Sequence, residues 1–309
     1  MDNELDDAIS VLSSKRPFSN GDLRRLGEAY KAGKKPDGAI RASIETWYEG
    51  LGRAAMVVVR KAIENVIGAQ GAHFAVKGIA QRLKTNETLV QKLNRGTYDL
   101  SRMQDYMGVR FDLDCYHSEL VEIGEEVAEI LAAASVDVKV EQILEFPHNG
   151  YRAVHLHLTS RTAGRVEVQL RTLLQAEWAN AYEKAGDVVG RSIRYDDEFV
   201  VEIPAMKDTV FKLLEISEQI YRMESVTERT AKNKHDTVDA LLKGLGRRYE
   251  ALPRDPDYYA KYSEAFHALG RMFAAQANQA VENSNLIHSL QMLENSLRLW
   301  STEAQRRQI

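Results

Sequence analysis

The segments GVRFDLDC (108–115), YRAVHLHL (151–158) and RVEVQLRT (165–172) alternate apolar and polar side chains. A period of two is typical of a β-strand that buries one face and exposes the other. VDVKVEQI (136–143) shows the same alternation and is rich in β-branched residues. These four segments predict a β-sheet in the middle of the chain.

Helical patterns separate and follow the predicted strands. HSELVEIGEEVAEILAAAS (117–135) lies between the first two in chain order, and LLQAEWANAYEKAG (173–186) follows the last. Strands and helices mixed in this way indicate an α/β or α+β fold in which helices pack on the sheet.

The rest of the chain is predicted to be helical. We expect three parts: an N-terminal helical segment (1–44), a central domain (45–200) and an all-helical C-terminal extension (201–309). In the first part, Ser19 and Asp22 have the spacing of a capping box, and Gly33 is a suitable end for the helix that follows.

Composition excludes several classes of protein. The 309 residues contain 41 Lys and Arg against 45 Asp and Glu, for a net charge of −4, so nucleic acid could be bound only through a local patch. A single cysteine, Cys115, excludes a disulfide scaffold and a cysteine-based zinc site. No apolar run approaches the roughly 20 residues that span a bilayer. We expect a cytoplasmic protein that does not bind membranes.

The polar faces of three predicted strands are rich in chemically active side chains. They are Arg110, Asp112 and Asp114 on the first, Tyr151, His155 and His157 on the second, and Glu167, Gln169 and Arg171 on the third. One interpretation is an antiparallel sheet with an ordinary solvated face. The other is a polyphosphate site, because the central polar positions of these strands lack Lys, Ser and Thr.

Two carboxylates are candidate metal ligands. Asp105 lies just before the first of these strands, and Glu167 lies within the last. If the strands bring them together, they form a site for a hard divalent cation such as Mg²⁺, which prefers oxygen ligands. Taken singly, each acid is better explained by a surface salt bridge.

A basic segment lies upstream, at residues 76–96. Its cations are Lys77, Arg82, Lys84, Lys92 and Arg95. Thr85 or Asn86 has the position of a cap for the helix ETLVQKLN (87–94), so backbone N–H groups and cations converge near its start. This is a suitable cradle for a nucleoside triphosphate, and the alternative is a solvated helix start.

Four motifs together resemble a known family. RLKTNETLVQK (82–92), RMQDYMGVR (102–110), NGYRAVHLHL (149–158) and VEVQLRT (166–172), in this order and spacing, resemble the synthetase domain of the RelA/SpoT family of alarmone synthetases. The resemblance covers about residues 45–200 and is to the small or toxic single-function members. It implies an α+β fold with a mixed, nucleotidyltransferase-like sheet flanked by helices.

The resemblance implies a Mg²⁺-dependent transfer of diphosphate from ATP to the 3′-hydroxyl of a purine nucleotide, converting GDP or GTP to ppGpp or pppGpp. The residues implied to hold ATP are Arg82, Lys84, Lys92 and Arg110. Asp105 is the implied metal ligand, and Glu167 is a second ligand or the base that accepts the hydroxyl proton. Tyr151 is implied to stack on the acceptor base. The remaining acceptor side is implied to be lined by Arg152, His155, Gln169 and Arg171.

Departures from the family pattern leave the acceptor open. Pro147 and His148 stand where many members have a lysine followed by a proline, and Ala153 stands where a serine is common. The acceptor is therefore GDP, GTP, an adenosine nucleotide or the 3′ end of tRNA. The tRNA alternative is a toxin with a neutralising antitoxin, and it has candidate backbone-binding patches at 24–36 and 244–254. A third alternative is an inactive nucleotide-binding module, and the C-terminal helices are candidates for binding a partner or a second copy.

Overall fold

The computed structural model describes residues 2–70, 75–95, 99–190, 192–195 and 207–249. The chain forms two compact units. The first comprises residues 1–147 and 152–173, and the second comprises residues 148–151 together with the chain from 174 onward. The second unit therefore includes a four-residue segment from the middle of the sequence. The domain boundaries predicted at residues 44 and 200 stay a prediction.

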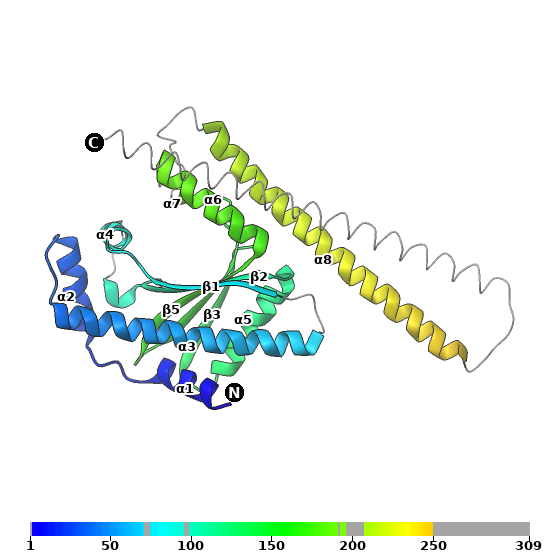
Figure 1. Cartoon of the computed structure of the whole chain (residues 1–309), viewed down its shortest axis with the longest axis horizontal. Helices are drawn as coiled ribbons and strands as arrows, with labels where there is room; N and C mark the ends of the chain where they lie inside the picture. Colours follow the sequence, from blue (N-terminus) through cyan, green and yellow to red (C-terminus); the bar gives the residue numbers. More distant parts are fainter. Residues whose placement is uncertain (1, 71–74, 96–98, 191, 196–206, 250–309) are drawn as a thin grey trace. The chain divides into compact units, whose positions relative to one another are not determined.

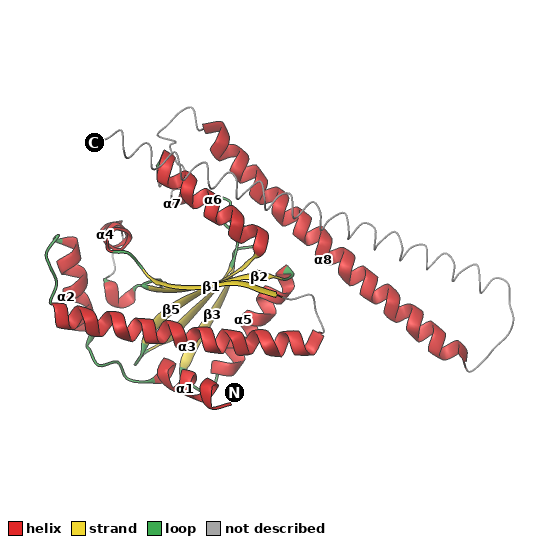
Figure 2. Cartoon of the chain, viewed as in Figure 1, coloured by secondary structure: helices red, strands yellow, loops and turns green. Residues whose placement is uncertain are grey.

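The helices and strands follow one another along the chain as Figures 1 and 2 show. The first unit contains α1 (Asp2–Ser13), α2 (Asn20–Lys31), α3 (Gly38–Gln70), β1 (Ala75–Leu83), α4 (Asn86–Arg95), η1 (Leu100–Arg102), β2 (Met107–Asp114), α5 (His117–Leu131), β3 (Val136–Gln142), β4 (Val154–Ser160) and β5 (Gly164–Thr172). The chain continues through α6 (Leu173–Val189), α7 (Ser192–Tyr195) and α8 (Lys207–Tyr249). No helix of the described ranges is long and apolar enough to cross a bilayer.

The five strands form one mixed sheet in the order β1-β2-β5-β4-β3. β2 and β5 are parallel, whereas the other three neighbouring pairs are antiparallel. The predicted α+β class, with a mixed sheet flanked by helices, is confirmed. The four segments that alternate in the sequence form β2, β3, β4 and β5.

The sequence reasoning missed one strand, β1. Its sequence, AVKGIAQRL, lacks a regular alternation, and its pairing with β2 has a register shift between Val76 and Gly78. β1 also lies at the end of the described sheet and has one strand neighbour. An edge strand with a glycine and an irregularity gives a weak period-two signal.

The placement of Tyr151 on the polar face of a strand is wrong. β4 begins at Val154, and Tyr151 forms an isolated bridge with His148. Asn149 and Gly150 both have positive φ angles, 48° and 79°, which reverse the chain tightly before the strand starts. Tyr151 therefore belongs to a turn and not to the pleated surface.

The apolar face of the sheet forms the core of the first unit. Phe111, Leu156 and Leu170 are fully buried, and helices α3 and α5 pack in this unit. α5 approaches the sheet closely at Gly124, where an added Cβ would lie 2.9 Å from Leu156. Since helices cover the apolar side, the opposite side carries the polar residues.

The N-terminal helical prediction is confirmed in detail. Ser19 caps α2 in a capping box with Asp22, and the helix ends just before Gly33, which has a φ of +62°. Of the predicted C-terminal extension, Lys207–Tyr249 form the single helix α8. The predictions that concern residues 250–309 lie outside the described residues.

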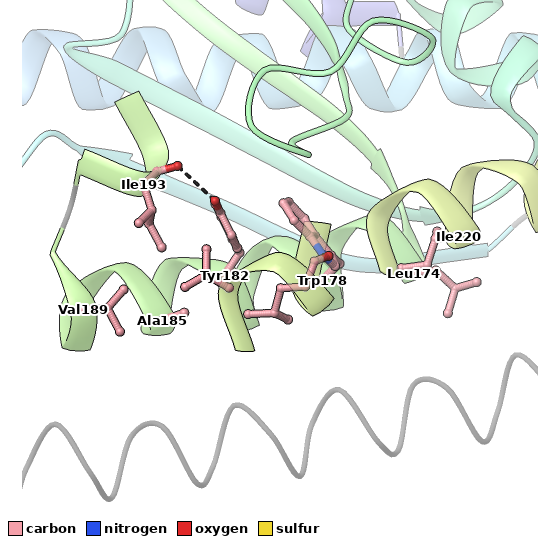
Figure 3. Packing of buried hydrophobic residues seen from close by; sticks show 9 residues of the cluster. Leu174, Trp178, Tyr182, Ala185, Val189, Ile193 and Ile220 are labelled. Carbon is pink, nitrogen blue, oxygen red and sulfur yellow. Dashed lines mark hydrogen bonds between the residues drawn. The ribbon is translucent and has the colours of Figure 1, made fainter. Parts of the chain in front are cut away.

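The core of the second unit is built on α6 and α8. The stacked rings of Trp178 and Tyr182 lie 4.7 Å apart between centroids. Trp178 Nε1 donates to the carbonyl of Leu213 at 2.6 Å, and the Tyr182 hydroxyl donates to the carbonyl of Ile193 at 3.0 Å (Figure 3). Each buried polar tip thus has a partner, as large aromatic side chains in a core require.

Gly150 lies against this core, which makes it a sensitive position. Gly150→Ala is expected to lower the free energy of unfolding by about 2 kcal/mol or more, because the residue has a φ of +79° and the new Cβ would lie 2.8 Å from the Trp178 ring. The matched control is Gly33→Ala, which has a φ of +62° but no neighbour within 4 Å, so it is expected to cost about 1 kcal/mol. Urea denaturation followed by circular dichroism measures both, and an equal cost would contradict the packing argument.

Candidate active site

The register of the sheet aligns polar side chains into rows that cross the strands. Gly108 of β2 lies opposite Arg82 of β1 on one side and Glu167 of β5 on the other. His157 of β4 continues this row beyond Glu167. Directly paired residues share one face of a sheet, so Arg82 and Glu167 face the same way across a residue that has no side chain.

A second row runs beside the first. Arg110 of β2 lies opposite Ala80 and Gln169, and His155 of β4 and Glu141 of β3 continue the row. Alternation within each strand predicts which side chains lie on the polar face. The order of the strands in the sheet then determines which of these side chains become neighbours.

A pocket of about 190 Å³ opens over these rows. It is lined by Ala80, Gln81, Arg82, Lys84, Asp105, Gly108, Val109, Arg110, Glu167 and Gln169. Asp105 and Glu167, singled out from the sequence, therefore line one cavity. Three of the four predicted ATP-binding cations also line it, and Lys92 is connected to it through Asp105.

Asp105 is held by two lysines. Its Oδ2 atom lies 2.5 Å from Nζ of Lys84 and 2.7 Å from Nζ of Lys92. Lys84 is positioned by the pairing of β1 with β2, since its N–H donates to the carbonyl of Tyr106, and Lys92 lies in the last turn of α4. Burial would raise the pKa of Asp105, but the charges and hydrogen bonds of the two lysines outweigh it and hold the pKa below its ordinary value.

Glu167 has polar neighbours on both sides. Nε2 of Gln169 donates to its Oε2 atom at 2.8 Å, and Nδ1 of His155 lies 3.9 Å from its Oε1 atom. The side chains of Glu167 and His155 are each 13% exposed. Burial lowers the pKa of His155 below its ordinary value, and the nearby charge of Glu167 only partly opposes this.

Arg171, one of the predicted acceptor-side residues, forms a buried ion pair. Its guanidinium donates twice to Oδ1 of Asp112, at 3.0 and 2.6 Å, and its side chain is 1% exposed. Asp112 lies directly opposite Arg171 in the parallel pairing of β2 with β5. In this structure Arg171 therefore stabilises the sheet beside the pocket.

The other predicted acceptor-side residues are distributed unequally. Gln169 lines the pocket and His155 lies beside Glu167. The Arg152 side chain is buried and donates to the carbonyls of Leu144 and Glu145. Tyr151 is part of the second unit. The first unit thus brings the two carboxylates, the three pocket cations and Gln169 together around one pocket. The guanidinium of Arg152 instead donates to backbone carbonyls.

Sequence reasoning missed the small residues of the pocket. Gly108 lies in the first row between Arg82 and Glu167, and Ala80 ends the second row beside Arg110, where bulky residues would fill the space. An added Cβ on Gly108 would find only the carbonyl oxygen of Arg82, at 3.8 Å. A glycine inside a strand of good β-formers was the available signal, because such a glycine often marks the close approach of a ligand.

The donor set of the pocket suits a hard divalent cation. Asp105 and Glu167 both offer carboxylate oxygens, and Oδ1 of Asp105 is buried without a hydrogen-bond partner among the described residues. A buried carboxylate oxygen without a donor is costly unless a cation or a ligand satisfies it. These oxygens fit Mg²⁺, which takes one or two carboxylates and shares its other positions with water and phosphate.

Comparison with solved structures finds a faint likeness. The complex between the Type VI effector Tas1 and its immunity protein matches 82% of this chain and 95% of that chain, with 13% sequence identity and a TM-score of 0.27. A TM-score this low supports no inference about this chain.

Comparison of sequences is more informative. Residues 81–186 match the family model described as "Region found in RelA / SpoT proteins". The uncharacterized proteins Mb1401 of Mycobacterium bovis and Rv1366 of Mycobacterium tuberculosis are each 36% identical over 193 residues, which is 62% of this chain and 67% of theirs. The matched region spans β2 to β5, and hence both carboxylates of the pocket. The chain belongs to the family of proteins that carry the RelA/SpoT region.

Proposed function

We propose that the chain is a Mg²⁺-dependent pyrophosphokinase, which transfers the diphosphate of ATP to the 3′-hydroxyl of a purine nucleotide such as GDP or GTP and releases AMP. The observation that carries this proposal is the shared pocket of Asp105 and Glu167, lined also by Arg82, Lys84 and Arg110. Two acids and three cations around one cavity suit a reaction on polyphosphate.

The chemistry needs positioning and charge neutralisation more than covalent participation. Arg82, Lys84 and Arg110 hold the negative oxygens of the triphosphate. Glu167 accepts the proton of the attacking hydroxyl, and Gln169, which donates to Oε2 of Glu167, keeps the carboxylate oriented. Mg²⁺ bound at the carboxylates supplies further neutralisation of the transferring phosphates.

The lysines around Asp105 suggest how the donor site fills. Lys84 and Lys92 both contact Oδ2 of Asp105 in the ligand-free chain. A triphosphate offers these two cations more negative charge than a single carboxylate does. When the phosphates engage the lysines, the Asp105 carboxylate would be released to hold a divalent cation, so nucleotide and metal binding would support each other.

The acceptor is the part of the proposal that the experiment must identify. The purified chain is incubated with Mg²⁺ and ATP labelled at the γ-phosphate, together with GDP, GTP, adenosine nucleotides or bulk tRNA in separate reactions. Label in a slower-migrating guanosine nucleotide supports the proposal. Label on tRNA identifies the toxin alternative, in which an antitoxin is the expected partner. The absence of labelled product with every acceptor overturns the pyrophosphokinase assignment and leaves an inactive nucleotide-binding module.

Glu167→Gln tests the proposed base. The substitution keeps the shape of the side chain but removes its capacity to accept a proton, so the turnover rate is expected to fall about 100-fold or more. The matched control is Glu129→Gln, an exposed glutamate on α5, whose rate is expected to equal that of the wild type. A Glu167→Gln variant with unchanged turnover would contradict the assignment.

Gly108→Val tests the pocket independently of the acids. The new side chain meets no protein atom closer than 3.8 Å at its Cβ, so the variant is expected to keep its stability, since valine favours a strand. Its isopropyl group fills space between Arg82 and Glu167, and we expect ATP to bind about tenfold more weakly or worse. Isothermal titration calorimetry measures the ATP affinity, and thermal unfolding measures the stability. Normal ATP affinity in the folded variant would place the donor site elsewhere.

A further inference from the structure

A second group of ligand atoms lies on the polar face, at the side of the sheet away from β1. Glu141 of β3 lies opposite His155 of β4, and His157 follows two residues later on the same face. The carboxylate of Glu141 and the two imidazoles each offer one ligand atom, and these three atoms lie within 4.8 Å of one another. Neither Glu141 nor His157 has a part in the proposed pyrophosphate transfer.

The three side chains already contact one another in part. Oε2 of Glu141 lies 2.9 Å from Nε2 of His157, and the ring centroids of His155 and His157 are 6.1 Å apart. The Glu141 side chain is 43% exposed, against 19% for His157 and 13% for His155. The group is therefore anchored in the sheet at its histidines and open to solvent at its carboxylate, which gives an ion a route of entry.

We propose that Glu141, His155 and His157 bind a divalent transition metal of the zinc type. Two imidazole nitrogens and one carboxylate oxygen are a ligand set that Zn²⁺ accepts, with water in the fourth position. Tetrahedral zinc with bonds of about 2.1 Å needs ligand atoms about 3.4 Å apart. Side-chain rotations that bring the most distant atoms closer by up to about 1.4 Å close the set.

The two metal sites on this face differ in their chemistry. Asp105 and Glu167 offer only oxygen atoms, which suit Mg²⁺, whereas the histidine group offers nitrogen, which binds later first-row metals far better. Nδ1 of His155 lies 3.9 Å from Oε1 of Glu167. The histidine group therefore lies beside the proposed base but shares no ligand with the carboxylate pair.

The test is a zinc titration of the full chain, without an affinity tag, against a chromophoric chelator of known affinity. The wild type is expected to bind one equivalent of Zn²⁺ tightly, and the double variant His155→Ala/His157→Ala is expected to lose this equivalent. Glu141→Gln changes an exposed side chain, so it folds normally, and its zinc affinity is expected to fall about tenfold or more. The matched control is His148→Gln, a histidine outside the group, whose zinc affinity is expected to equal that of the wild type.

Two further measurements make the outcome decisive. Co²⁺ bound to the wild type is expected to give the visible absorption of a four-coordinate ion, and the absorption is expected to disappear in the double variant. Excess Mg²⁺ is expected to leave the zinc equivalent in place. Tight zinc binding that survives in Glu141→Gln and in the double variant overturns the proposal, as does displacement of zinc by Mg²⁺. Because these readouts require no nucleotide, they stand whatever the pyrophosphate assay shows.

Discussion

The buried ion pair between Arg171 and Asp112 fixes the parallel pairing on which the pocket depends. A guanidinium that is 1% exposed requires a partner, and Asp112 supplies it from the directly opposed position on β2. A slip of one residue in this pairing would move every side chain of one strand to the other face. Glu167 and Gln169 would then point into the apolar core. The pair thus secures the register that faces Glu167 toward Arg82 across Gly108.

Local sequence patterns predicted most helices and strands of this fold. The pairing of strands that are distant in the sequence determines which residues line the pocket. Alternation predicted β2 to β5, and the spacing of Ser19 and Asp22 predicted the start of α2, because both signals lie within a few residues of sequence. β1 escaped because a glycine and a register shift interrupt its pattern. Tyr151 was misplaced because it has the parity of His155 and His157, although Arg152 and Ala153 interrupt the alternation and the strand begins only at Val154.

The expected meeting of Asp105 and Glu167 has a different origin. No periodicity links a residue just before one strand to the middle of another strand 62 residues later in the sequence. Family motifs in order predicted that these acids act together, and the parallel neighbours β2 and β5 bring both to one cavity. The burial of Arg171 was not predictable. An arginine on the polar face of a strand is expected to be exposed to solvent unless its partner, here Asp112, is known. From β1 to β4, the polar face passes from the cations Arg82 and Arg110 through Glu167 to the imidazoles of His155 and His157.

The segment 148–151 packs with helices that come later in the chain. It lies in sequence between β3 and β4, yet it packs with the second unit, where Gly150 contacts the ring of Trp178 and its carbonyl accepts from the Ser217 hydroxyl. The polypeptide therefore enters this unit twice. Shortening the chain after β5 would remove the helices against which residues 148–151 pack. Helix α8 lies outside the family region 81–186, yet it packs against a segment that lies inside that region.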